Sequence, residues 1–491
     1  MAALQFAPVA QVPSARVWSS FQNDIFAFVE HGQGHAVVQA VAGSGKSTTI
    51  IEAFKRVNHL NSVFLAFNKA IVNDLAAKGV NAKTFNSVGH NAVLATGRTF
   101  CGDGGYRSKL QQIIKANLSA SDAKLYGSVL DKLVNVGKQA GVGTKYGMVN
   151  CVSSWITLAE HYDIDCEDGD PRVLYEHAVN LLNASNSSKL FDFGDQLYMP
   201  VLFDLALPKY DLLFVDEAQD TNYIQREMLK KMMYEDSRLI AVGDSHQAIY
   251  GFRGADSEAL FLIKREFGAI ELPLTVSYRC ATSIIDEARK YVSHITAAPN
   301  APVGEVLTIG TMWKTDDFKA NDMVLCRMNR PLITLAFTLL RARVRFYVKG
   351  KDVGAGIKSL INSQKAIDVK DLVNKIHVWA DKKIAALSDD DKGMAEVILD
   401  KRDTVLALTD GCASVSEILL NLDFMFTEQD NAVVLSTIHK AKGLEADTVY
   451  ILTGKGQFKR KGLLAWQEEQ EVNLTYVAIT RAKSKLIYIQ E

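Results

Sequence analysis

The sequence predicts an α/β protein of two lobes, each a doubly wound parallel sheet interrupted by a mainly helical insertion. Short β-rich runs with the length and flanks of buried parallel strands alternate with helical stretches along the chain. A glycine turn follows the first of these runs directly, as in phosphate-binding folds. The runs form two sets, at 36–41, 63–66, 212–215 and 239–242, then at 323–326, 344–348, 433–436, 449–452 and 486–489.

Two long helical stretches divide these sets and give the expected domain organisation. The second stretch is charge-rich between positions 381 and 403, and neither is of low complexity. We expect a first lobe at 1–90 and 190–276 with a helical insertion at 91–189, and a second lobe at 277–349 and 431–491 with a reduced helical insertion at 350–430. In doubly wound sheets the ligand binds where the strands end, so each lobe should present its chemistry at that edge.

Composition narrows the class of protein. The chain has 491 residues, 48% of them hydrophobic, which suits about three to four domains. With a net charge of −1, any nucleic-acid surface must be a local groove. The six cysteines form no C-x-x-C pair, which argues against zinc, an iron–sulfur cluster or a disulfide framework. No apolar run approaches the about 20 residues of a membrane span, and no signal peptide is evident, so we expect a cytoplasmic protein without a membrane partner.

The segment 40–47 is typical of a phosphate-binding loop. An apolar strand runs into a glycine turn, a lysine and a hydroxyl, so the backbone N–H groups of the turn would surround a triphosphate. Lys46 would reach its outer oxygens, and the Ser47 hydroxyl would ligate magnesium. The strict pattern has glycine where this chain has Ala40, and a chance turn that caps a helix is the alternative. The expected contacts are Ala42, Gly43, Ser44, Gly45, Lys46, Ser47 and Thr48.

Two later strands end in polar side chains at the same predicted edge. Asp216 and Glu217 close the strand at 212–215, where the first would hold magnesium and the second would polarise the attacking water. Gln247 follows the strand at 239–242 and is placed to touch the γ-phosphate or the water. Tyr250 and Phe252 could stack on nucleobases, although aromatic residues at this spacing are more often part of a core.

Taken together, these segments resemble the UvrD/Rep type of superfamily 1 DNA helicases. The series adds 253–256, 277–279, 437–445 and 476–482 in the family's order, and runs from Gln22 to Arg481. The residues at 66–69 and 84–87 most resemble the branch that includes the F-box DNA helicases, although no F-box-like segment is evident before the helicase motifs. The resemblance implies two RecA-like P-loop domains that use ATP and Mg²⁺.

The resemblance also implies roles around the nucleotide. Gln22 would read the adenine edge and Tyr278 would stack on the ring. Arg279 and Arg481 would grip the γ-phosphate from the second lobe only when the cleft is closed, which links ATP binding to closure. Glu445 would touch the ribose or γ-phosphate side. The implied catalytic set is Lys46, Asp216, Glu217, Gln247, Arg279 and Arg481, with Ser47 and Asp216 on the metal.

DNA would lie across both lobes, held through backbone contacts that are independent of base sequence. Arg253 would couple the γ-phosphate to the DNA-contacting loop, and His439 has an alternative as a structural histidine. The contacts implied by the family pattern are Phe67, Asn68, Thr84, Phe85, Tyr250, Phe252, Arg253 and His439.

The resulting hypothesis is an ATP-dependent translocase on single-stranded DNA that unwinds tailed duplexes with 3'–5' polarity. Because the insertion at 350–430 is small and the chain stops ten residues after Arg481, translocation is better supported than efficient unwinding. A strand-separating wedge is expected at 458–466 or in 91–189. Replication or recombination proteins are the expected protein partners, and the compact chain suits a viral or mobile-element origin.

Three alternatives stay open on the sequence. The first is a translocase that mainly strips proteins, such as recombinase filaments, from DNA. The second is a DNA-binding module switched by nucleotide, which the retention of Glu217, Gln247 and both arginines argues against. The third is a small-molecule P-loop kinase, disfavoured because the second lobe has its own motif series in place of a substrate lid.

Overall fold

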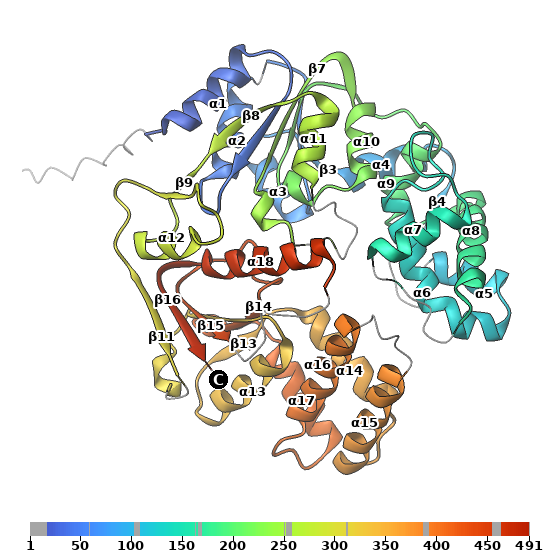
Figure 1. The fold of residues 1–491 in the computed structure, drawn as a ribbon, viewed down its shortest axis with the longest axis vertical. Coiled ribbons are helices and arrows are strands. Elements are labelled where there is room, and N and C mark those ends of the chain that lie inside the picture. The colour runs from blue at the N-terminus through green and yellow to red at the C-terminus, as the bar shows by residue number, and fades with distance from the viewer. Residues whose placement is uncertain are drawn as a thin grey trace, which may run out of the picture.

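The computed structural model describes residues 17–57, 59–102, 109–162, 164, 169–249, 251, 258–310, 313–385, 392–453 and 463–490. The chain forms two lobes that meet along the helix α18 (Ala465–Ile479), with a helical region beside the first lobe and another beside the second (Figure 1). Each lobe contains a six-stranded sheet whose paired strands are all parallel. This confirms the predicted α/β class.

The first sheet has the strand order β3-β2-β6-β7-β1-β8. Its strands are β1 (Ala36–Ala40), β2 (Ser62–Ala66), β3 (Ala82–Thr84), β6 (Tyr210–Val215), β7 (Met233–Gly243) and β8 (Ile270–Leu274). The helices around it are α1 (Ser20–His31), α2 (Lys46–Arg56), α3 (Lys69–Ala77), α4 (Phe85–Leu94), α9 (Asp195–Leu202), α10 (Tyr223–Lys231) and α11 (Ala259–Phe267). Every residue of β2 is buried, as expected for an interior strand covered by helices on both faces.

The first helical insertion packs around a hydrophobic cluster that it shares with α4, α9 and α10 of the first lobe. It consists of α5 (Lys109–Asn117), α6 (Ala120–Gln139), α7 (Val152–Tyr162) and α8 (Pro171–Ser187), closed by the short pair β4 (Thr99–Phe100) and β5 (Leu190–Phe191). Trp155 is fully buried at the centre of this core. Lys109 and Lys138 are buried as well, and both bind the carboxylate of Asp195, at 2.6 and 2.7 Å. Paired burial of this kind avoids the desolvation cost of a lone charge.

The second sheet has the order β11-β16-β15-β12-β14-β13. Its strands are β11 (Glu305–Ile309), β12 (Met323–Cys326), β13 (Phe346–Val348), β14 (Val433–Thr437), β15 (Ala446–Thr453) and β16 (Ala482–Gln490). Helices α12 (Thr282–Ala288), α13 (Asn329–Arg341) and α18 pack on it. The short parallel pair β9 (Val276–Ser277) and β10 (Thr296–Ala297) lies where the chain passes from the first lobe to the second.

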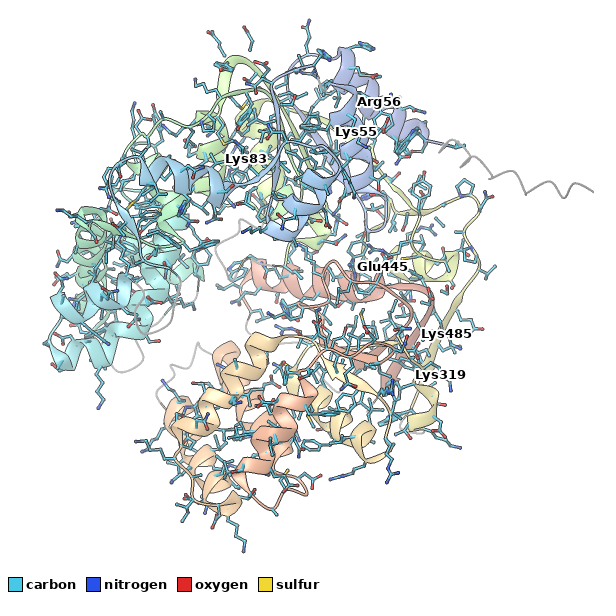
Figure 2. All side chains as sticks on the ribbon, turned by 180° about the vertical axis from the view of Figure 1, so that it is seen from behind. Lys55, Arg56, Lys83, Lys319, Glu445 and Lys485 are labelled. Atoms are coloured by element: carbon cyan, nitrogen blue, oxygen red, sulfur yellow. The ribbon has the colours of Figure 1, made fainter. Side chains whose placement is uncertain are left out.

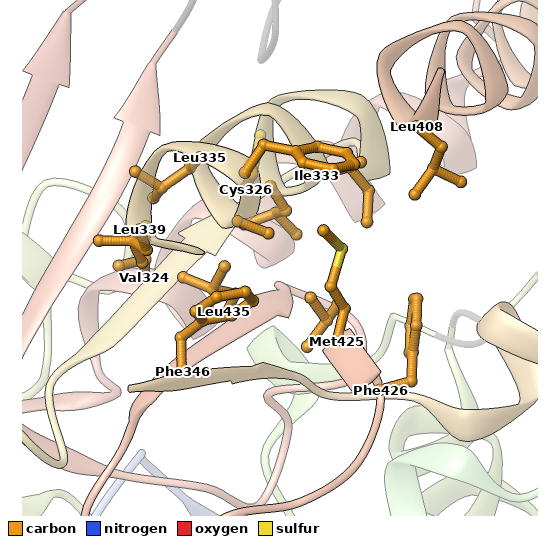
Figure 3. Packing of buried hydrophobic residues seen from close by; sticks show 14 of the residues in the cluster. Val324, Cys326, Ile333, Leu335, Leu339, Phe346, Leu408, Met425, Phe426 and Leu435 are labelled. Atoms are coloured by element: carbon orange, nitrogen blue, oxygen red, sulfur yellow. The ribbon is translucent and has the colours of Figure 1, made fainter. Parts of the chain in front are cut away.

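The second helical insertion shares its core with the lobe. Its helices are α14 (Lys351–Ser363), α15 (Val369–Ala385), α16 (Lys392–Leu408) and α17 (Val415–Met425). Leu408, Met425 and Phe426 from this insertion belong to the same cluster as Phe346 and Leu435 of the sheet (Figure 3). The four helices are therefore packed into the lobe, as the first insertion is packed against α9 and α10.

Three strands of these sheets were not expected from the sequence, β3 and β8 in the first sheet and β11 in the second. β8 carries Pro273 and lies at the sheet edge, where a missing N–H is tolerated. Among the helices in the described part of the chain, none combines the length and the apolar character that crossing a membrane requires.

Candidate active site

A cavity of about 1070 Å³ lies where the first sheet's strands end and the second lobe faces them. Residues 43–48 of the loop after β1 line it from the first lobe. Arg279, Lys442 and Arg481 line it from segments that are far away in the sequence. The structure therefore brings both predicted arginines to the phosphate-binding loop, as required of a cleft between two lobes.

The loop after β1 depends on two glycines with positive φ, Gly43 at 72° and Gly45 at 79°. A Cβ on Gly43 would lie 2.5 Å from the Cβ of Arg279 and 2.7 Å from Ser277 Oγ. Only glycine avoids both the strain and the collision here. The Tyr278 N–H donates to the Gly43 carbonyl at 2.8 Å, so the second-lobe motif is bonded directly to the loop.

Lys46 begins α2 and points into a group of carboxylates. Its Nζ lies 3.5 Å from Glu217 Oε1, and the side chain is 11% exposed. Burial alone would lower the pKa of Lys46, but Glu217 and Asp244 outweigh it and raise that pKa. The lysine is therefore held as a cation, the form that binds phosphate oxygens.

The Ser47 hydroxyl donates to Asp216 Oδ2 at 3.1 Å, which places the two predicted metal ligands together. Burial, followed by the neighbouring Glu217 charge, raises the pKa of Asp216 to about 6. One hydroxyl and one carboxylate form the hard-oxygen set on which Mg²⁺ is held beside phosphates and waters. Ser44 Oγ is also buried here without a hydrogen-bond partner among the described residues, which leaves a donor for a phosphate oxygen.

Glu217 has a backbone conformation that is unusual for a residue with a side chain, with φ of 50°. Strain of this kind is often kept where a side chain must be aimed. Burial would raise the pKa of Glu217, but Lys46 and Lys442 outweigh it and lower it to about 2. Gln219 donates to Glu217 Oε2 at 2.5 Å and fixes the carboxylate, which is therefore ionised and able to accept a proton.

Gln247 ends the short 3-10 turn η3 (Ser245–Gln247) that follows β7. Its Nε2 donates to Asp244 Oδ2 at 2.6 Å, and the side chain is buried. Asp244 N–H in turn donates to the amide oxygen of Gln219 at 3.1 Å. The turns after β6 and β7 are thus tied together at the strand ends.

Arg279 lies in the cleft with two partners. Its Nε donates to Glu445 Oε2 at 2.7 Å and its Nη1 to the Thr480 carbonyl at 3.2 Å. Figure 2 labels Glu445 on the part of the second lobe that faces the first. Lys483 also binds Glu445, at 2.9 Å, so this carboxylate holds a pair of cations beside the loop. The ring of Tyr278 is 49% exposed and free to receive a flat ligand.

Arg481 is 1% exposed although it carries a guanidinium group. It donates to the carbonyls of Val477 and Leu444, and its Nη2 lies 3.5 Å from Gln247 Oε1. Burial, followed by the charge of Arg279, lowers the pKa of Arg481 to about 10. A buried guanidinium beside another positive charge would be stabilised by an anionic ligand in the cavity.

Lys442 is a residue of the cleft that the sequence analysis quoted in a motif without assigning a role. Its Nζ lies 2.7 Å from Asp220 Oδ2 and donates to the Gln247 carbonyl at 2.8 Å, so it joins the lobes. Burial raises the pKa of Asp220 to about 6, even though Lys442 acts to lower it. The sequence signal for a role of Lys442 in the site was its place in the turn between β14 and β15 of the second lobe.

Gln22 is buried beside the loop, where its Nε2 donates to Thr49 Oγ1 at 2.8 Å and its oxygen accepts the Ser19 N–H at 3.0 Å. The same side chain closes the capping box of α1. Nε2 would lie 3.7 Å from a Cβ on Gly45, so the amide is next to the phosphate loop.

The expected DNA contacts divide into four groups. Phe67 is half-buried and Asn68 exposed, and both line the cavity. Thr84 caps α4 by accepting the Ser87 N–H, and His439 is half-buried. Phe85 differs from the expectation, because its ring is 2% exposed within the core and lies 6.3 Å from that of Phe67. Tyr250, Phe252 and Arg253 lie outside the described residues, as does 458–462 of the expected wedge.

The cavity continues past the phosphate loop to the first helical insertion. Asn86, Asn135 and Phe193 line this part, and the Phe193 ring is 51% exposed. None of the three was expected from the sequence. The sequence offered only a weak signal here, the two aromatic residues Phe191 and Phe193 directly before α9.

Two family models match the chain. The UvrD/REP helicase N-terminal domain matches residues 21–268, and the UvrD-like helicase C-terminal domain matches residues 410–491. The first contains the phosphate loop and the acidic strand end, and the second contains Arg481. These matches imply two RecA-like domains.

Curated relatives agree with these models. The F-box DNA helicase protein 1 of Schizosaccharomyces pombe is 24% identical over 92% of this chain, which spans 55% of that relative. A probable DNA helicase II homolog of Mycoplasma pneumoniae is 21% identical, with 94% of this chain and 83% of the relative covered. The ATP-dependent DNA helicase Rep of Buchnera aphidicola subsp. Acyrthosiphon pisum is 31% identical over 26% of this chain and 21% of its own length. The chain therefore belongs to the UvrD/Rep family of DNA helicases.

Proposed function

We propose that this protein is an ATP-dependent motor that moves along single-stranded DNA with 3'–5' polarity and opens tailed duplexes ahead of it. The observation that carries the proposal is the single cavity shared by Lys46, Arg279 and Arg481. Residues of both lobes line it, so a ligand there stabilises the closed arrangement and its loss releases it. Membership in a DNA helicase family supplies the substrate class, and the polarity rests on the family resemblance alone.

Bound ATP with Mg²⁺ would supply an activated phosphoryl group to this cleft. Gly45, Lys46 and the N-terminus of α2 hold the phosphates, while Ser47 and Asp216 hold the metal. Lys46 exchanges its contact with Glu217 for the phosphate oxygens, because its cationic form is already enforced by the surrounding carboxylates. Gln22 and the exposed ring of Tyr278 form the adenine end of the site in this proposal.

Hydrolysis requires a base, an oriented water and a cation for the charge that develops. Glu217 is the ionised acceptor for the proton of the water, and Gln247 orients that water. Arg279 and Arg481 stabilise the charge on the transferred group, a role in which such arginines contribute about 10³ to 10⁵ in kcat. Both arginines are delivered by the second lobe, so turnover depends on the closed cleft.

DNA binding is proposed for the part of the cavity wall that leads away from the phosphate loop. Phe67 and Phe193 offer exposed ring area there, and stacking on bases is tolerant of sequence. Asn68, Thr84 and His439 stay in the proposed contact set with Tyr250, Phe252 and Arg253. Phe85 is proposed to support Phe67 from beneath, because its own ring has no exposed face.

A strand-displacement assay tests the proposal directly. Duplexes with a 3' tail, a 5' tail or blunt ends are mixed with the protein, ATP and Mg²⁺, and opening of the 3'-tailed duplex alone is expected. Lys46→Ala is the inactive partner, and Lys55→Ala, on the same helix but outside the cavity, is the matched control. Opening of 5' tails alone would overturn the polarity. ATP turnover that is slow and indifferent to DNA would favour a nucleotide-switched module.

A protein roadblock on the DNA distinguishes an unwinding motor from the alternative, a translocase that mainly strips proteins from DNA. The duplex assay is repeated on single strands coated with a recombinase filament, and release of the filament protein is followed beside strand opening. A motor whose main task is unwinding opens bare duplex readily. Weak opening beside rapid filament removal would assign the chain to protein displacement, and so to recombination rather than replication.

A further inference from the structure

Helix α18 presents one polar stripe to the first lobe, at Trp466, Gln470, Asn473 and Tyr476. The spacing of three and four residues places these side chains on a single helix face. Trp466 Nε1 donates to the His161 carbonyl at 3.0 Å, and Asn473 Nδ2 donates to the Ala248 carbonyl at 3.1 Å. In Figure 1 α18 lies along the boundary between the lobes.

Tyr476 stands at the end of this stripe nearest the phosphate loop and is fully buried. The Ala42 N–H donates to its hydroxyl oxygen at 2.9 Å, and the hydroxyl lies 3.4 Å from Asp244 Oδ2, to which it donates. One atom of the second lobe therefore joins two turns of the first lobe, the phosphate loop after β1 and the turn after β7. The Tyr476 hydroxyl bridges the two turns only while α18 is docked.

Asp244 transmits this contact to the catalytic glutamine. The same Oδ2 atom accepts a hydrogen bond from Gln247 Nε2 at 2.6 Å, which leaves the amide oxygen of Gln247 facing Arg481 at 3.5 Å. Asp244 is fully buried, and its Oδ1 accepts the His246 N–H at 3.1 Å, so the carboxylate is held within the turn after β7. A shift of Asp244 would therefore turn the Gln247 amide away from the water and from Arg481.

We propose that Tyr476 is a positioning residue for ATP hydrolysis, whose hydroxyl sets Asp244 and through it the orientation of Gln247 when the lobes close. The inference rests on the proposed function and deepens it, because it names a group that makes turnover conditional on docking of α18. Tyr476 touches neither the nucleotide nor the water in this role. Its ring packs in a buried cluster that includes Val41 and Ile249 of the first lobe and lies 6.1 Å from the His246 ring, contacts that a change to Phe would keep.

The test is Tyr476→Phe, which removes one oxygen atom and keeps the ring. We expect kcat for DNA-stimulated ATP hydrolysis to fall by about tenfold, since two buried polar groups lose a partner that orders the catalytic turn. KM for ATP should change by less than about threefold, because the phosphate contacts of Lys46 and α2 are retained. Tyr488→Phe is the matched control, since that hydroxyl bonds Glu287 within the second lobe at 3.3 Å.

A double-mutant cycle distinguishes positioning from general support of the fold. If Tyr476 acts through Gln247, Tyr476→Phe in a Gln247→Ala background should lower kcat by less than about twofold. A purely structural role would lower the melting temperature and leave kcat of the folded enzyme unchanged. The inference would be overturned by that result. It would also be overturned by a rise in KM at constant kcat, or by full additivity of the two substitutions in the cycle. If the wild-type enzyme showed no DNA-stimulated ATP turnover, that result would instead contradict the proposed function, on which this inference depends.

Discussion

Arg481 Nη2 of the second lobe lies 3.5 Å from the amide oxygen of Gln247 in the first, inside a region where both side chains are buried. A guanidinium in this position is shielded from water and therefore acts strongly on any charge placed beside it. The two residues lie 234 positions apart in the chain and belong to different lobes. Their contact therefore exists only when the lobes are together. Their separation is a direct measure of closure.

Replacing Arg481 with Ala should reduce the maximal ATPase rate on the order of 10³-fold, because the developing negative charge loses its buried cation. Single-strand binding should persist, since the proposed DNA contacts lie elsewhere on the cavity wall. Fluorescence anisotropy with a labelled strand and a coupled ATPase assay measure the two properties. Arg341→Ala, a change at an arginine paired with Asp410 on the exterior, is the control. Undiminished turnover by Arg481→Ala would remove this arginine from the mechanism.

Replacing Asp216 with Asn should weaken the apparent affinity for Mg²⁺ by more than about tenfold in titrations of ATPase activity, because a neutral amide is a poorer ligand for a hard cation. Nucleotide binding measured without metal should change little. Asp236→Asn, at an exposed site on β7, should titrate like the wild type. An unchanged Mg²⁺ curve for Asp216→Asn would contradict the assignment of the metal site.

Replacing Asp195 with Ala should destabilise the protein by about 3 kcal/mol, because Lys109 and Lys138 would remain buried without their shared carboxylate. Burial would raise the pKa of Asp195, but Lys138 and Lys109 outweigh it and lower that pKa, so the contribution is present at neutral pH. Urea unfolding followed by intrinsic tryptophan fluorescence measures the change, and Trp155 of this region is one of the five tryptophans that contribute to it. Glu176→Ala, exposed on α8, should leave the midpoint within error.

His35 should make stability depend on pH. Its Nδ1 accepts the Leu239 N–H at 3.0 Å, which requires the neutral ring. Burial and then the charge of Arg238 lower the pKa of His35 from 6.5. The stabilising contribution is therefore complete above pH 6.5 and is lost as the pH falls through the lowered value, since the unfolded chain then binds more protons.

The measurement is the urea midpoint at pH 5.5 and 7.5. His35→Asn keeps an acceptor without a titrating group, so its midpoint should drop less on acidification than that of the wild type. His59→Asn, at an exposed position, should behave as the wild type does. Equal acid sensitivity of His35→Asn and the wild type would show that the ring is not the titrating group.

Much of this fold was predictable because the interior strands are short, apolar and followed by polar turns. β2 and β6 were expected within two residues of their observed bounds for this reason. β3, β8 and β11 were missed because they lie at sheet edges, and edge strands need not be apolar. β8 carries an internal proline, and only one of its residues is buried. No local sequence pattern marks such a segment as a strand, since its hydrogen bonds to the neighbouring strand determine its conformation.

Chemistry fixes both residue type and order at Lys46, Asp216 and Arg481, so their approach to one cleft was predictable, while their roles stay predictions. It was not predictable where function depends on contacts between distant segments. Tyr476 was quoted only as part of a motif, and nothing in the sequence indicates that its hydroxyl reaches Ala42. Phe85 illustrates the opposite error, since a motif position was expected at a surface and the sheet buried it.

Both helical insertions share their interiors with the lobe beside them. The cluster around Trp155 in the first insertion also contains Tyr198 and Ile224 of the first lobe. The second contributes Leu408, Met425 and Phe426 to the same interior as the sheet. Excising it would remove the cover from β13 and β14. Each insertion should therefore change in step with its own lobe, since neither can be exchanged without opening the interior of the motor.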